Sequence, residues 1–328
     1  MKYLNLFLCC LFGMAFSVHA EIVSDNDKVL SSLFLDITAT SDGALYAVGD
    51  RGHIYHMSSG QWLSQASGTD AALTRVHESP SQQLWAVGHD GVILTKREDS
   101  WELVRENIQE QMPLFDILFL NGSEGIAIGA YGLFLRTQDG GNTWQHELHQ
   151  GLLLAEDIEY LEELKEESIE EYEYELSAML PHLNQLTHLG QGKLMLVGEA
   201  GLVALSDDRG LTWTRQETNY YGSFFDSLQI GKRLVIAGLR GHVFYSDDNG
   251  QSWQESRTNS LATINGLLSV EDDNIMALAS NGVFLVSSDQ GATFTTHQLE
   301  QGESALAGDV FNHQHYIVSD HGIRILNW

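Results

Sequence analysis

The stretch Thr137-Gln138-Asp139-Gly140-Gly141-Asn142-Thr143-Trp144 decides the fold, because the chain repeats its pattern three more times. The further copies begin at Ser206, Ser246 and Ser287, and the last of them ends in phenylalanine in place of tryptophan. Successive copies start 69, 40 and 41 residues apart. A repeat of about 40 residues built on short apolar runs predicts the blades of a β-propeller rather than a helical solenoid.

This pattern is an Asp-box, and its residue types predict a structural role. The aspartate can accept backbone N–H groups across a turn, the glycine supplies a positive φ, and the aromatic ring fills space between neighbouring sheets. Four copies favour architecture over chemistry, since a site that is used once needs no repetition. The residues assigned to this role are Asp139, Trp144, Asp208, Trp213, Asp248, Trp253, Asp289 and Phe294.

A second repeat predicts the number of blades. Seven tight turns between apolar runs close on a glycine, at Gly52, Gly91, Gly132, Gly201, Gly241, Gly282 and Gly322. These glycines are 39, 41, 69, 40, 41 and 40 residues apart, which predicts an all-β, seven-bladed β-propeller with one insertion. No residues remain after Trp328 for a last strand, so residues 21–30 are expected to complete the seventh blade and close its edge.

The first 20 residues have the pattern of a signal peptide. Lys2 precedes the apolar run Leu4–Phe16, and Val18-His19-Ala20 offers small residues for cleavage. Both cysteines of the chain, Cys9 and Cys10, would leave with this peptide. Leu6-Phe7-Leu8 lacks the small residue expected before a lipidated cysteine, so plain export is favoured over a lipoprotein. The expected product is residues 21–328, located in the periplasm or a lumen and free of thiol chemistry.

Charge excludes some partners. The chain has 45 acidic and 17 basic residues, a formal net charge of −28. Such a surface repels nucleic acid and anionic lipid headgroups, so neither is an expected partner. It suits a soluble protein, or one that meets a basic partner.

The insertion occupies residues 149–181, between the third and fourth repeats. From Glu156 to Glu175 it holds 11 acidic residues and one base, Lys165. Apolar residues recur every three to five positions from Leu154 to Leu176, which predicts an amphipathic helix. Two interpretations stay open: a solvated acidic helix on the rim of the disk, or a functional segment, either a docking arm or a lid over the central channel.

A candidate binding surface follows from strand alternation. If the strands of a blade are named A to D from the inside outward, the B–C turns and the D–A connections share one face of the disk. The residues assigned to partner binding on this face are Arg51, His89, Tyr131, Tyr220, Tyr221, Phe224, Phe225 and Arg240. Arginine and aromatic residues are enriched at binding hot spots, although the two arginines could instead pair with neighbouring carboxylates.

Enzyme and metal sites find little support in the sequence. There is no Gly-x-Ser-x-Gly elbow, and a sialidase, which shares the Asp-box, needs an arginine triad, whereas no arginine is assigned to an inner strand. His53 and His56 would point to opposite faces of a strand, and His313 and His315 have no evident third ligand. We therefore expect no catalytic residue, no metal and no cofactor.

With its Asp-boxes, its Gly-x-x-Gly turns and its seven repeats, the chain resembles the photosystem II stability/assembly factor family of BNR-repeat propellers over nearly all of residues 30–328. The resemblance implies an exported, non-enzymatic protein that assembles membrane-protein complexes through its propeller face, and a transporter or a photosystem-like assembly is the candidate complex. We also expect a monomer. Only Arg51 and Arg240 hold the arginine of the turn motif, and the acidic insertion is no part of it. The alternative is a glycan-binding or glycoside-hydrolysing propeller, for which a convergent carboxylate pair in the channel would be the sign.

Overall fold

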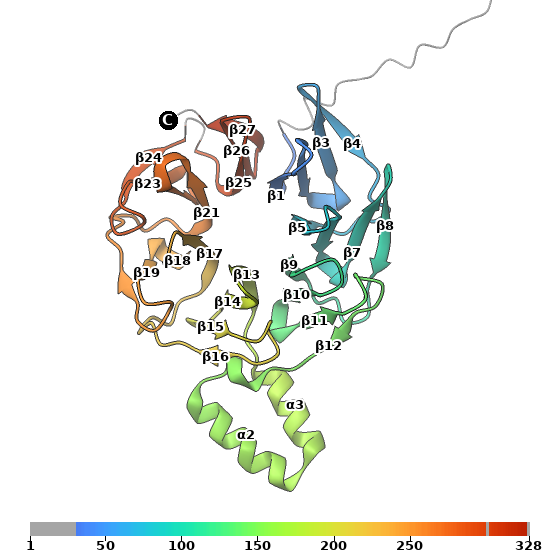
Figure 1. Ribbon diagram of the computed structural model, residues 1–328, viewed down its shortest axis with the longest axis vertical. Coiled ribbons are helices and arrows are strands. Elements are labelled where there is room, and N and C mark those ends of the chain that lie inside the picture. The colour runs from blue at the N-terminus through green and yellow to red at the C-terminus, as the bar shows by residue number, and fades with distance from the viewer. Residues whose placement is uncertain (1–30, 300–301, 327–328) are drawn as a thin grey trace, which may run out of the picture.

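Seven antiparallel sheets stand around a central axis in the order in which the chain forms them, as the computed structural model shows (Figure 1). The structure describes residues 31–299 and 302–326. The first four blades are β1–β4 (Phe34–Ala39, Leu45–Gly49, Ile54–Ser58, Gln61–Gln65), β5–β8 (Leu73–Glu78, Leu84–Gly88, Ile93–Arg97, Ser100–Arg105), β9–β12 (Leu114–Phe119, Gly125–Gly129, Phe134–Thr137, Gln145–His146) and β13–β16 (Leu183–Gly190, Lys193–Gly198, Val203–Ser206, Thr214–Arg215). The others are β17–β20 (Phe224–Ile230, Arg233–Gly238, Val243–Ser246, Gln254–Glu255), β21–β24 (Ile264–Val270, Asn274–Ala279, Val283–Ser287, Thr295–Gln298) and β25–β27 (Ala305–Phe311, Gln314–Ser319, Gly322–Leu326). The predicted seven-bladed propeller is confirmed.

The core lies between blades. Strand B is buried along its whole length in the first three blades, because both of its faces are covered by neighbouring sheets. Val48 and Ile54 of the first blade, for example, pack with Leu73 and Ala86 of the second. This is why the sequence shows short continuous apolar runs in place of strict alternation.

The Asp-box carboxylates bind within their own turns. Asp139 accepts the Thr143 N–H at 2.9 Å and the Thr143 hydroxyl at 2.7 Å, and the other three copies repeat these bonds. The hydrogen bonds lower the pKa of Asp208 and of Asp248 to about 2, for Asp208 against the opposing effect of burial. Trp144 packs edge-on against Trp85 of the preceding blade, at 6.4 Å between ring centroids. These contacts fit the structural role that the repeat predicts.

Carboxylates of the inner strands tie odd-numbered blades to the next blade. Each accepts a backbone N–H from the inner strand of that blade, at 2.6–2.8 Å: Asp36 from Val76, Asp116 from Leu186, Asp226 from Leu267, and Asp309 from Ala39. The last of these bonds joins the seventh blade to the first and so closes the ring. No inner strand pairs with the next as a ladder, so side chains must bridge the gap.

Even-numbered blades make the reverse bond. Their side chains donate to a carbonyl at the start of the following inner strand, at 2.7–2.8 Å: Thr74 to Leu114, Asn184 to Phe224, and Asn265 to Ala305. All seven junctions therefore carry a hydrogen bond from one inner strand to the next. We call this set of bonds the inner belt.

The seventh blade has fewer strands than the other six within the described residues. Within the described residues this blade has three strands, and β27 is its outermost. The expected fourth strand from residues 21–30, like the expected signal peptide at residues 1–20, lies outside the described residues. Both stay predictions.

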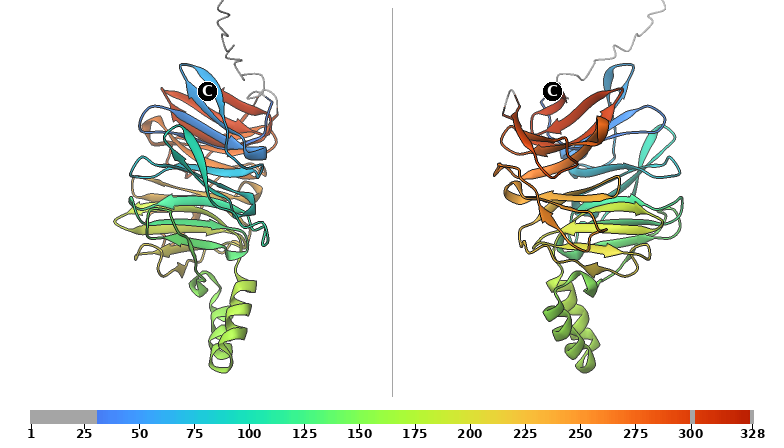
Figure 2. Two further views of the ribbon diagram at one scale, coloured as in Figure 1. Left: turned by 90° about the vertical axis from the view of Figure 1, so that its right-hand side faces the viewer. Right: turned by 60° about the vertical axis from the view of Figure 1, so that its left-hand side comes forward.

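The insertion is a pair of helices, α2 (Ala155–Glu167) and α3 (Ile169–Met179), where the sequence predicted one. Ser168 ends α2 and caps α3, since its hydroxyl accepts the Glu171 N–H at 3.2 Å. The pair projects outward from the rim, away from the channel (Figures 1 and 2). The lid interpretation is therefore wrong. No helix among the described residues has the length and apolar character to cross a membrane.

The root of this helical arm belongs to the propeller core. Leu152, Leu153 and Leu180 are buried together with Trp213 and Leu183 of the fourth blade. The Gly132 N–H also donates to the Pro181 carbonyl at 2.9 Å, which holds the end of the arm against a B–C turn. The arm thus leaves the disk on a fixed base.

Replacing Asp309 by alanine should destabilise the closed ring. The Ala39 N–H then loses its acceptor, which costs about 1–3 kcal/mol. Asp309→Asn keeps one acceptor oxygen and should lose less, and Asp70→Ala removes an exposed carboxylate as a control. Urea unfolding measures the three differences. Equal stability of Asp309→Ala and Asp70→Ala would show that the closing bond contributes nothing.

Two deletions of different length should distinguish the contribution of the outer part of the arm to stability from that of its root. A short Gly/Ser linker in place of residues 155–178 removes 11 acidic residues and one lysine and leaves the root leucines in place, so the propeller should fold with nearly unchanged melting temperature. Deleting residues 152–180 also removes Leu152, Leu153 and Leu180, and each buried leucine contributes about 2–5 kcal/mol. Calorimetry of both variants tests this. Similar melting temperatures for the two would contradict the assignment of the root to the core.

Candidate functional site: the face of the B–C turns and the central channel

The B–C turns present their side chains outward because of a repeated backbone conformation. Arg51, Tyr131 and Arg240 have φ of 53°, 52° and 57°, and each precedes the closing glycine of its turn. A Cβ on Gly52 would lie 2.0 Å from the Thr69 carbonyl oxygen, and φ there is +68°. The glycine is therefore required twice, by its conformation and by its contact with the D–A connection. The residue before this glycine, Arg51, is therefore exposed to solvent.

The two arginines of this face differ in their surroundings. Arg51 is 79% exposed, and its Nε lies 3.4 Å from a carboxylate oxygen of the adjacent Asp50. Arg240 is exposed and forms no ion pair within the described residues. The alternative of pairing with a neighbouring carboxylate therefore applies to Arg51 alone, and an exposed pair of this kind contributes about 0–1 kcal/mol. His89 is also exposed on this face.

The aromatic residues of this face divide into exposed and buried ones. Tyr131 and Tyr221 are 65% and 77% exposed. Tyr220 is half-buried, because its hydroxyl donates to the Leu239 carbonyl at 3.0 Å and its ring lies 4.4 Å from that of His242.

Phe224 and Phe225 lie in different places, and the assignment of Phe224 to partner binding is wrong. Phe224 is fully buried against Phe244, while Phe225 lines the central channel. Successive residues of a strand point in opposite directions, so only one of the pair can face the opening.

Sequence reasoning missed His182, which supports Tyr131. The His182 Nδ1 accepts the Tyr131 N–H at 2.9 Å, and the two rings meet edge to face at 4.6 Å. His182 follows Pro181 at the start of the fourth blade, on the D–A connection. No motif marks it, since its partner is 51 residues away along the chain.

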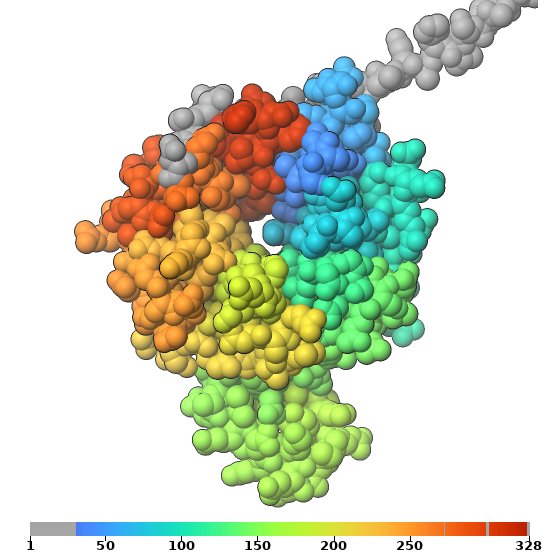
Figure 3. All heavy atoms as spheres, in the orientation of Figure 1, coloured from blue at the N-terminus to red at the C-terminus, as the bar shows by residue number. Residues whose placement is uncertain are grey.

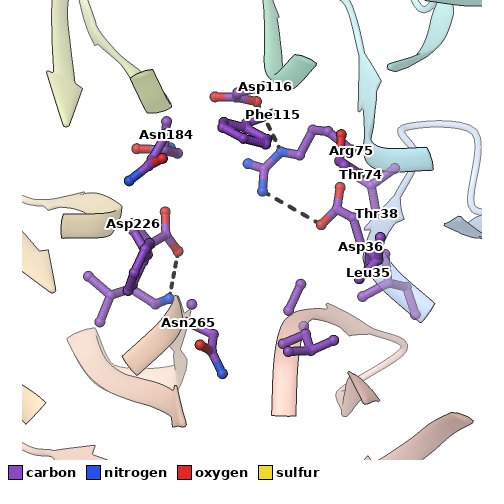
Figure 4. Close-up of a pocket in the computed structure, with 18 of the residues that line it drawn as sticks. Leu35, Asp36, Thr38, Thr74, Arg75, Phe115, Asp116, Asn184, Asp226 and Asn265 are labelled. Carbon is purple, nitrogen blue, oxygen red and sulfur yellow. Dashed lines mark hydrogen bonds and ion pairs between the residues drawn. The ribbon is translucent and has the colours of Figure 1, made fainter. Parts of the chain in front are cut away.

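The central channel contains a cavity of about 390 Å³ near the start of the inner strands, visible as the hollow in Figure 3. Because the inner strands begin at the D–A connections, this end of the channel belongs to the same face as the B–C turns. Its most prominent group is Arg75 on β5, so the expectation that no inner strand holds an arginine is wrong. Arg75 Nε lies 3.1 Å from Asp116, and Nη1 lies 3.6 Å from Asp36 (Figure 4).

Burial sets the protonation of the channel groups. It raises the pKa of Asp36 to about 6 even though Arg75 favours the ionised form, and it raises that of Asp226 to about 6. The neighbouring carboxylates raise the pKa of Arg75, chiefly Asp36, so the guanidinium stays charged. Burial and Arg75 together lower the pKa of His77 to about 4, which leaves this histidine neutral.

The channel carboxylates are engaged by the backbone. Asp116 accepts the Ile117 N–H on one oxygen and the Leu186 N–H on the other, and Asp226 does the same with Ser227 and Leu267. A glycoside hydrolase needs one carboxyl group as a proton donor and a second that attacks or activates water. The carboxylate oxygens of Asp116 and Asp226 already accept backbone N–H groups. This arrangement fits a structural role in the inner belt better than it fits glycoside hydrolysis. Among the described residues, no three His, Cys, Asp or Glu side chains group as a metal site.

Stability should rise and then fall as the pH decreases. Asp36 and Asp226 have folded pKa values near 6, above the unfolded value of about 3.9, so protonation between about pH 6 and pH 4 stabilises the fold. Asp208 and Asp248 have folded values near 2, so below about pH 4 their contribution is lost. Chemical unfolding from pH 8 to pH 2 measures this curve. Asp226→Asn should reduce the gain, and a decline beginning at pH 7 would contradict the assignment.

The comparisons with known proteins agree on repeat and fold. The BNR/Asp-box repeat family matches residues 244–255. No curated protein matches the chain by sequence. A solved structure of YCF48 bound to D1 peptide has 16% identity and a TM-score of 0.66, covering 91% of this chain and 95% of its own. YCF48 from Cyanidioschyzon merolae has 12% identity and a TM-score of 0.66, over 90% and 95% of the two chains.

A third solved structure also has a similar fold. It is the extracellular domain of a putative hybrid two component system from B. thetaiotaomicron, with 11% identity and a TM-score of 0.67. The match covers 91% of this chain and 40% of that one. The resemblance predicted from the sequence is thus confirmed for the repeat and the fold: the chain carries BNR/Asp-box repeats on a seven-bladed propeller similar to that of YCF48.

Proposed function

We propose that this protein is an exported scaffold that binds a subunit of a membrane-protein complex through the face carrying the B–C turns. One observation carries the proposal: Arg51, Arg240, Tyr131 and Tyr221 are exposed on a single face of a closed disk. Arginine and tyrosine are the residue types that most often supply binding energy at protein interfaces. Arg51, Arg240 and Tyr131 lie on turns whose backbone the closing glycine holds, which lowers the entropic cost of ordering these side chains on binding.

Four further points support the proposal. YCF48, whose structures share this fold, has been solved with a D1 peptide, which favours a protein as the ligand here. The sequence pattern of residues 1–20 supports export. The resemblance to assembly factors supports a partner in a membrane complex. A net charge of −28 makes nucleic acid and anionic lipid poor alternatives.

A glycan-binding or glycoside-hydrolysing propeller is the second candidate, and the channel gives it one observation. Asp36 and Asp116 both approach the same guanidinium, so two carboxyl groups converge at Arg75. Their backbone hydrogen bonds favour a structural role. Turnover of a chromogenic glycoside that Asp116→Asn abolishes, with the fold preserved, would decide for this candidate.

The arginines of the face should be needed for partner capture. A benzophenone amino acid at position 221, in protein recovered from native membranes, identifies the cross-linked partner. Arg51→Ala combined with Arg240→Ala should then reduce the yield of that cross-link about tenfold or more, as loss of two hot-spot residues would, and leave the melting temperature within a few degrees.

The matched control is Arg97→Ala with Arg209→Ala. These two exposed arginines lie on the opposite face, at a C–D turn and in an Asp-box, and their loss changes the net charge equally. Their removal should leave the cross-link unchanged. Equal yields from both double variants would assign the partner to another surface.

A further inference from the structure

The helical arm carries exposed aromatic residues that the propeller core does not use. Of the four exposed tyrosines among the described residues, Tyr160 and Tyr174 lie on α2 and α3, 48% and 70% exposed. Figure 3 shows the arm standing clear of the disk, so the blades do not cover these rings. Both rings line one hollow, and exposed aromatic side chains that share a concave surface are typical of a binding site.

The groove between the helices has a fixed shape. Tyr160, Leu164 and Tyr174 line a hollow of about 470 Å³ together with Glu170, Glu171 and Glu175. Leu161 and Leu176 are buried and hold the helices together, and Ser168 caps the corner. The groove is therefore formed before any ligand arrives.

The charge of the groove is negative and uncompensated. Glu170, Glu171 and Glu175 form no ion pair within the described part of the chain. Lys165 is the one base of the arm, and its Nζ lies 4.8 Å from the centroid of the Tyr172 ring, whose hydroxyl donates to Gln150. Neither Lys165 nor Tyr172 lines the groove, so the base does not neutralise it.

We propose that this groove binds a basic amphipathic segment of a partner protein, one that presents Lys or Arg together with apolar side chains. The three glutamates attract the basic groups, and the two tyrosines accept either apolar contacts or a cation over the ring. A second copy of so acidic a chain would be repelled, as would an anionic membrane surface. The inference deepens the proposed scaffold function, because it names a second contact and its chemistry.

Fluorescence anisotropy with synthetic peptides tests the site on the full mature chain. The probe is a labelled peptide of Lys, Arg and Leu at helical spacing, and a second peptide replaces every Leu by Ser at equal charge. The first peptide should bind more tightly than the second. Its affinity should fall steeply as salt rises toward 1 M, where the screening length is about 3 Å.

Variants on the two sides of the arm distinguish the groove from bulk charge. Glu170→Gln with Glu171→Gln and Glu175→Gln should weaken binding about tenfold, and Tyr160→Ala with Tyr174→Ala should do so as well. The control, Glu159→Gln with Glu163→Gln and Glu166→Gln, removes the same charge from exposed residues outside the groove and should cost about twofold. Circular dichroism checks that the arm stays helical in each variant.

Four results would overturn the proposal. They are equal losses in the two glutamine variants, equal affinity for the Leu and Ser peptides, a dimer in sedimentation that Tyr174→Ala dissociates, and binding to zwitterionic vesicles that the tyrosine variant abolishes. Each assigns the groove to another occupant or to charge alone. None concerns Arg51 or Arg240, so failure here leaves the test of the proposed function intact.

Discussion

The structure depends on how the inner strands of neighbouring blades are joined at the axis. These strands converge but do not form a common sheet, so backbone groups near their starts would lack partners in a crowded channel, and an unpaired buried amide costs about 1–3 kcal/mol. Short polar side chains supply these partners at all seven junctions. In odd-numbered blades a carboxylate accepts an N–H group of the next inner strand, and in even-numbered blades a side chain donates to a carbonyl of the next inner strand. Burial in the channel raises the pKa of the Asp36 carboxyl group, the charge of Asp116 adds a smaller rise, and Arg75 favours the ionised form. The arginine of the channel is thus explained by the belt that it neutralises.

The belt also explains why we place the proposed binding site on the surface and not in the channel. Channel oxygens that already accept N–H groups are poorly placed to serve a ligand or a reaction. The side chains of the B–C turns are not part of the belt, since the glycines make the close contacts and the residue before the glycine is exposed in every turn but that of Asp90. A substitution at that one position would change the face and leave the contacts of the glycine in place. Arg51, Tyr131 and Arg240 occupy this position in three blades, and Asp90 and Ala200 occupy it in two others.

The sequence was sufficient for the architecture because its strongest signals are local. An Asp-box and a closing glycine each report on one turn, and their spacing counts the blades. The predictions that were wrong concern contacts that depend on the register of a strand or on residues far away in the sequence. Arg75 lies in Leu-Thr-Arg-Val-His-Glu, which is not an apolar run, so its place on an inner strand was not visible. Phe224 is buried and Phe225 lines the channel, and a shift of the strand register by one residue would reverse these positions. The break in the arm did have a signal, the capping pattern from Ser168 to Glu171, which the longer apolar periodicity obscured.

The root of the arm is attached directly to a turn of the B–C face. The relative position of the two surfaces is therefore fixed before a partner binds. Gly132 and Leu180 lie in contact, and the Gly132 N–H binds Pro181, so the end of α3 is fixed to the turn that presents Tyr131. His182, the next residue, supports that tyrosine directly. A partner that reached both surfaces would make its second contact without ordering a flexible linker, so the two weak sites would act as one stronger site. Their opposite charges would also fix the direction in which it lies, because its acidic part meets the arginines and its basic part meets the arm.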